Sequence, residues 1–84
     1  MISLSISPTA VVAAFRDVDV ALPLRLSDSD IGVILDDEGV DVITIDVNGD
    51  RSDDQVTAIA AMIISAVNNI AGMEAAIAAA EARQ

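Results

Sequence analysis

Residues 52–82 of this chain read SDDQVTAIAAMIISAVNNIAGMEAAIAAAEA, and this stretch decides the fold. Ser52 and Gln55 have the spacing of a capping box. In this motif the Ser52 hydroxyl accepts a hydrogen bond from the backbone N–H of Gln55, and the Gln55 side chain accepts one from the backbone N–H of Ser52. The two aspartates between them lie where carboxylates interact favourably with the positive end of a helix dipole. Almost every later residue is a good or tolerable helix former. The stretch is therefore predicted to be a helix that begins after Ser52.

Apolar residues recur in this helix at alternating steps of three and four, the spacing of a heptad seam. The seam consists of Val56, Ile59, Ile63, Ala66, Ile70, Met73, Ile77 and Ala80. A second set widens the seam into a broad stripe, made of Ala60, Ile64, Val67, Ala71, Ala75 and Ala78.

The helix is long for so small a domain. An unbroken helix over residues 53–82 is about 45 Å long, whereas a compact chain of this size has a radius of gyration of roughly 12 Å. Its end is therefore expected to extend beyond its own sheet. With 54% hydrophobic residues, the chain also has more apolar surface than one small globule easily hides. We predict a homo-oligomer whose interface contains Ile63, Ile70, Met73 and Ile77.

Gly72 leaves the continuity of the helix open. A glycine costs about 1 kcal/mol relative to alanine inside a helix, and a break after Ala71 would let a second helix start at Met73 and fold back. The heptad register passes through Gly72 without slipping, which favours a continuous or gently kinked helix.

The first half of the chain reads mainly as β-structure. Alternating apolar and polar residues, or short apolar runs bounded by turn residues, predict strands. Pro23 cannot donate to a ladder, so its strand is expected at an edge or a bulge. The last two strands are expected to form an antiparallel hairpin across a short turn that contains Gly39. The predicted strands are residues 2–7, 18–26, 31–35 and 40–47.

Residues 8–16 have two interpretations. Ser7 followed by Pro8 is typical of a capped helix start, but the segment can equally continue as extended chain. In either case the prediction is an α+β fold in a single domain, 1–84. Residues 1–47 are expected to be mainly β, with a small antiparallel sheet of three or four strands, and residues 52–82 to be helical.

The charge and the missing residue types limit the function. Fourteen acidic residues and four arginines give a formal net charge of −10, and the chain has no lysine, histidine, cysteine, tyrosine or tryptophan. No thiolate, imidazole or amine side chain is available as nucleophile, base or soft metal ligand. We therefore expect a non-enzymatic binding protein with no cofactor and no metal. The dispersed arginines argue against direct nucleic-acid binding and against an anionic membrane surface.

The expected location is the cytoplasm. The chain has no cysteine for disulfides, and its first residues lack the basic region of a signal peptide. No apolar run is expected to cross a membrane, because polar residues interrupt the C-terminal segment at Ser65, Asn68, Asn69 and Glu74.

Ten of the fourteen acidic residues lie between Asp28 and Asp54. Such a concentrated negative field can imitate a nucleic-acid backbone and occupy a basic groove. The simpler interpretation is a solvated face that keeps an apolar chain soluble, with aspartates at turns and caps. The predicted partner-binding face is centred on Asp36, Asp37, Glu38 and Asp41.

Two further patterns concern ligands. Residues 46–54 resemble a calcium loop in their oxygen spacing, but Arg51 stands where such loops need glycine and Thr57 where they need a bidentate acid. A capped strand-to-helix turn explains the same residues without a metal. Arg51 also precedes a helix N-terminus, where phosphates bind, so Arg16, Arg25 and Arg51 gathered between subunits are a candidate nucleotide-binding set.

The C-terminal half resembles a group of small phage-encoded accessory proteins. The resemblance covers about residues 45–75: a strand, the Asn48-Gly49-Asp50-Arg51 turn, an acidic cap, and a helix containing Ala66-Val67-Asn68 and Ala71-Gly72. It implies a phage or prophage accessory protein, in the cytoplasm of the host cell. Proteins of that kind often disarm host defences by binding, although no functional residue carries over.

Three functions remain in view. The first is an inhibitor of a host defence system, acting through its acidic surface on a basic host protein. The second is an oligomeric sponge that sequesters a small nucleotide immune signal. The third is a structural or scaffold oligomer in which the helix is the whole function.

Overall fold

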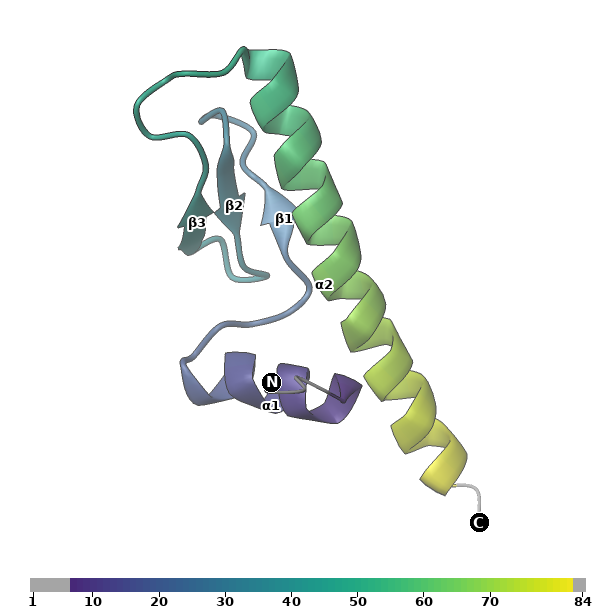
Figure 1. Ribbon diagram of the computed structural model, residues 1–84. Coiled ribbons are helices and arrows are strands. Elements are labelled where there is room, and N and C mark those ends of the chain that lie inside the picture. The colour runs from purple at the N-terminus through teal and green to yellow at the C-terminus, as the bar shows by residue number, and fades with distance from the viewer. Residues whose placement is uncertain (1–6, 83–84) are drawn as a thin grey trace, which may run out of the picture.

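The long C-terminal helix is the largest element of the fold, and the other elements lie along it (Figure 1). The computed structural model describes residues 7–82. The sheet packs against the first half of the long helix, and the N-terminal helix lies beside its second half. The elements in chain order are α1 (Pro8–Asp17), β1 (Arg25–Leu26), β2 (Val33–Leu35), β3 (Asp41–Thr44) and α2 (Asp53–Ala82). The predicted α+β fold, a small antiparallel sheet followed by a long C-terminal helix, is confirmed.

Residues 8–16 are helical, which decides between the two interpretations. Ser7 is the N-cap of α1, and its hydroxyl accepts a hydrogen bond from the Ala10 amide at 3.1 Å. Pro8 occupies the first turn, where its missing N–H costs nothing. The helix ends at Asp17, and two residues later Asp19 adopts a left-handed conformation with φ of 62°. Most of the predicted strand 2–7 lies outside the described residues.

The sheet is smaller than predicted. Its strand order is β1-β2-β3 and both pairs are antiparallel, with an irregularity between Ile34 and Leu35. β2 and β3 form the expected hairpin. The predicted third strand loses its first two residues, because Gly32 has a φ of 77°, and the fourth strand ends at Thr44, shortly before Asp46 with a φ of 56°.

The predicted strand 18–26 was wrong except for its last two residues. Its alternation reflects a loop whose apolar side chains pack inward, since Leu24 is buried and Val20 and Leu22 pack against the core. The Leu22–Pro23 peptide bond is cis. The expectation that residues 1–47 are mainly β was also wrong: the described part holds a ten-residue helix and strands of two, three and four residues.

The core lies between α2 and the sheet. Ile34 of β2 and Ala60 of α2 are fully buried, and Leu24 and Val56 are nearly so. Asn68 of α2 adds a polar link, because its side chain accepts a hydrogen bond from the Leu24 amide at 2.7 Å and donates one to the Leu24 carbonyl at 2.8 Å. The segment entering β1 is thereby tied to the middle of α2.

α2 is one continuous helix, so the alternative of a break at Gly72 was wrong. Its capping box is formed as predicted: the Ser52 hydroxyl accepts from the Gln55 amide at 3.2 Å, and the Gln55 side chain accepts from the Ser52 amide at 3.1 Å. A Cβ atom added at Gly72 would meet no other atom within 4 Å.

Gly72→Ala should therefore stabilise the fold. Alanine removes the backbone-entropy cost of a mid-helix glycine without a clash, so the free energy of unfolding should rise by about 0.5–1 kcal/mol. Urea unfolding followed by circular dichroism measures it. Gly32→Ala is the contrasting variant: its Cβ would lie 2.5 Å from Cγ1 of Val56 in a left-handed conformation, so it should destabilise. A destabilised Gly72→Ala variant would contradict the continuous helix.

Candidate interaction surfaces

Asp36, predicted to belong to an exposed acidic face, is buried. Only 2% of its surface is exposed. Its Oδ1 accepts hydrogen bonds from the amides of Glu38 and Val40, both at 2.9 Å, and its Oδ2 accepts one from the Ala21 amide at 3.3 Å. A carboxylate used in this way organises its own backbone, so Asp36 cannot contact a partner and that part of the predicted face was wrong.

These bonds also act on the acidity of Asp36. The amide of Val40 lowers the pKa of the carboxyl most, burial opposes this, and the amides of Ala21 and Glu38 and the charge of Arg25 lower it further. The net result is a pKa below the ordinary value of 3.8. The ionised form therefore holds the turn between β2 and β3.

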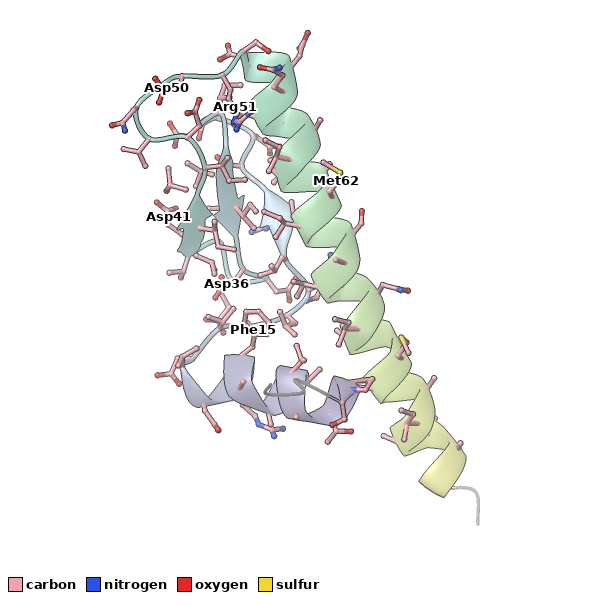
Figure 2. The ribbon with its side chains drawn as sticks, in the orientation of Figure 1. Phe15, Asp36, Asp41, Asp50, Arg51 and Met62 are labelled. Carbon is pink, nitrogen blue, oxygen red and sulfur yellow. The ribbon has the colours of Figure 1, made fainter. Side chains whose placement is uncertain are left out.

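The other three residues of the predicted face are exposed. Asp37 and Glu38 lie on the turn that Asp36 organises, and Asp41 begins β3 (Figure 2). The Asp37 amide donates to the Ala21 carbonyl at 2.8 Å, so the turn is also attached to the loop before β1. We name Asp37, Glu38 and Asp41 the turn acids.

Of the candidate nucleotide-binding arginines, Arg51 lies apart from Arg16, whereas Arg16 and Arg25 both lie next to residues of the β2–β3 turn. Arg16, Arg25 and Arg51 are all exposed. Arg51 precedes α2 at the far end of the molecule from α1, which carries Arg16 (Figure 1). The Arg25 Nε donates to the Asp36 carbonyl at 3.3 Å, so this side chain also belongs to the turn. Arg16 lines a hollow of about 270 Å³ together with Asp19 and Glu38, and two carboxylates there oppose an anionic ligand.

The loop before α2 is held by Asp46. Its Oδ1 accepts from the Asp50 amide at 3.0 Å and its Oδ2 from the Arg51 amide at 2.8 Å. Its oxygens thus bond to the backbone, and the calcium-like spacing has a structural explanation. Within residues 7–82, no three acidic, histidine or cysteine side chains are placed to hold a metal ion.

α2 faces the sheet with residues of both predicted apolar sets, since Val56 of the heptad seam is buried as well. Ala60 is buried, and Ile64 and Val67 pack against the core. Ile63, predicted to lie between chains, is partly buried and also packs against this core. Ile70 is half-buried within the chain.

The opposite side of α2 is exposed and apolar. Met62 is 64% exposed, Met73 50% and Ile77 42%. Figure 2 shows Met62 directed away from the sheet. By length and composition, Asp53–Ala80 could cross a membrane, and 11% of its most apolar window is buried. A single helix that meets this condition is weak evidence for a membrane protein, so the expectation that no segment crosses a membrane stays a prediction.

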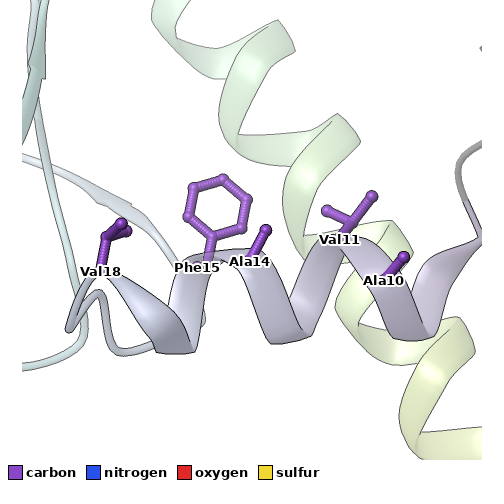
Figure 3. Close-up of a pocket in the computed structure, with 5 residues that line it drawn as sticks. All are labelled: Ala10, Val11, Ala14, Phe15 and Val18. Carbon is purple, nitrogen blue, oxygen red and sulfur yellow. The ribbon is translucent and has the colours of Figure 1, made fainter.

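A shallow apolar hollow follows one side of α1 (Figure 3). Its volume is about 260 Å³, and it contains Phe15, the single aromatic residue of the chain. The lining residues are Ala10, Val11, Ala14, Phe15 and Val18. Ligand sites normally add a few polar groups that orient the ligand, and this lining provides no polar side chain.

Comparisons with protein families, with characterised proteins and with solved structures found no match to this chain. The surfaces described above therefore carry the functional argument alone.

Asp36→Asn should lower stability in a pH-dependent way. The folded-state pKa of Asp36 is depressed, so its stabilising contribution is complete above the ordinary pKa of 3.8 and is lost as pH falls through the folded value. The stability difference between the wild type and Asp36→Asn should therefore be largest near neutral pH and shrink below about pH 4. Urea unfolding at a series of pH values measures this difference.

Asp37→Asn is the matched control, because it removes a neighbouring exposed carboxylate but none of the three side-chain hydrogen bonds. If Asp36→Asn and Asp37→Asn gave the same stability at every pH, the structural role of Asp36 would be refuted.

Proposed function

We propose that this protein is a non-enzymatic binding protein, an inhibitor of a host defence system of the type that phages encode, whose turn acids engage a basic surface of a host protein. The observation that carries the proposal is the construction of the β2–β3 turn. One buried carboxylate fixes the backbone, and the neighbouring acids Asp37, Glu38 and Asp41 remain exposed.

A fixed turn supports binding because little conformational entropy is lost when it docks. Preorganised loops bind more tightly than mobile ones that present the same groups. The hydrogen bonds from Glu38 and Val40 to Asp36, and from Asp37 to Ala21, hold the turn before any partner arrives. The turn acids are thus presented at fixed separations, which favours a partner with basic groups at matching positions.

The charge of the whole chain supports the same partner class. A formal charge of −10 attracts basic surfaces and repels nucleic acid and anionic membranes. Electrostatic complementarity of this kind mainly raises the association rate and the specificity. Such binding should weaken as salt is added, since exposed charges are screened.

The nucleotide-sponge alternative has less support. It requires Arg51 together with Arg16 or Arg25 of the same or a neighbouring chain. Within one chain Arg51 lies far from Arg16, and nearby carboxylates oppose an anion at Arg16.

Reversing the turn acids tests the proposal. The variant Asp37→Lys, Glu38→Lys, Asp41→Lys keeps Asp36 and should remain folded. The amount of basic partner that the immobilised variant captures from a bacterial lysate should fall at least tenfold, as quantified by mass spectrometry.

The matched control is Asp17→Lys, Asp28→Lys, Asp50→Lys, which makes the same change in net charge at exposed positions elsewhere. It should keep most of the capture. If both variants lost capture equally, net charge alone would explain the effect. If both kept it equally, the turn acids would not be part of the interface. Either result contradicts the proposal.

A further inference from the structure

The exposed side of α2 forms a continuous uncharged strip on a strongly acidic molecule. Successive helix residues are about 100° apart, so the side chains of the strip lie within about 80° of arc. We name this strip the outer face; its members are Met62, Ala66, Asn69, Met73, Ile77 and Ala80. All six are exposed. From Gln55 to Met73 the helix contains no charged residue at all.

We propose that the outer face binds a second copy of this chain in an antiparallel helix pair. This inference does not rest on the turn acids, which lie on the β2–β3 turn and at the start of β3. Two copies of an acidic protein repel each other, so a self-contact is favoured where charge is absent. The outer face meets this condition over most of the helix.

Charge also selects the antiparallel direction. Ten of the fourteen acids lie between Asp28 and Asp54, in the first turn of α2 and in the sheet and loops beside the first half of this helix. A parallel pair would bring two such acidic ends together, whereas an antiparallel pair places them at opposite ends of the complex. Antiparallel helix dipoles add a small favourable contribution of their own.

The exposed side chains indicate the register. Met62 and Ile77 are the first and the last large apolar residues along the outer face. An antiparallel pair covers both of them fully when its twofold axis crosses α2 between Asn69 and Ile70. Met62 then faces the partner's Ile77, and Ala66 faces the partner's Met73, so a small residue receives a large one. The two Asn69 side chains lie close to the axis, where a polar residue can define the register.

A membrane is a less suitable occupant of this surface. Insertion would require the whole circumference of α2, but Val56 and Ala60 cover the sheet and Asn68 holds the Leu24 backbone. Entry into lipid would therefore dismantle the core. Glu74 would also have to enter the bilayer, where a charged side chain is costly.

The contact is modest in size. The strip from Met62 to Ala80 is about 28 Å long, and one helix pair of that length buries less than the roughly 800 Å² per partner of a standard stable complex. We therefore expect a dimer that dissociates in the micromolar range.

Directed cross-linking tests both the pairing and its direction, because the chain has no cysteine of its own. Met62→Cys and Ile77→Cys variants are mixed at high concentration and oxidised, and the products are weighed by mass spectrometry. A disulfide forms only where Cβ atoms come within about 4.5 Å. The antiparallel pair should give mainly the mixed Met62→Cys/Ile77→Cys dimer. Dominant self-linked dimers would indicate a parallel pair and overturn the proposal, as would the absence of any linked product.

Sedimentation equilibrium provides the second readout. Met62→Glu should raise the dissociation constant of the dimer at least tenfold, whereas the control Ala61→Glu, exposed but about 100° further round the helix, should leave it nearly unchanged. A wild type that stays monomeric at all concentrations, or that instead sediments with phosphatidylcholine vesicles, would refute the self-contact.

Discussion

The rest of the structure depends on the attachment of the sheet to α2, and the Asn68 side chain is its most specific element. Its amide completes the hydrogen bonding of the buried Leu24 backbone, accepting at 2.7 Å and donating at 2.8 Å. β1 is only two residues long and lies at the edge of the sheet, so ladder bonds alone fix it weakly. With the segment before β1 tied to α2, Ile34 packs onto Ala60, and one side of α2 becomes the inner face of a small core.

The two surfaces proposed to bind partners follow from this attachment. Because one side of α2 covers the sheet, the opposite side is left uncovered, and it is uncharged along most of its length. The loop before β1, held by Asn68, in turn supplies the Ala21 groups that bond to Asp36 and Asp37. The acidic turn and the apolar outer face are therefore separate surfaces that share one support.

The sequence predicted the elements set by local chemistry. The capping box at Ser52, the N-cap at Ser7 as one of two interpretations, and the hairpin of β2 and β3 depend on residues close together in the chain. Features set by distant contacts were missed. An aspartate in a turn reads the same whether it faces water or, like Asp36, bonds inward. With no charge to mark its outer side, the apolar pattern of α2 could not show which stripe faces the sheet, so the packing of Ile63 against the core was missed.

The attachment of the sheet to α2 is tested most directly by comparing two neighbouring asparagines. Asn68→Ala leaves the buried Leu24 amide and carbonyl without partners and should lower the free energy of unfolding by about 1–3 kcal/mol. Asn69→Ala changes an exposed residue one position later and should shift it by less than about 0.5 kcal/mol. Both are measured by urea unfolding at concentrations low enough to exclude self-association. Equal effects of the two substitutions would contradict the central role of Asn68.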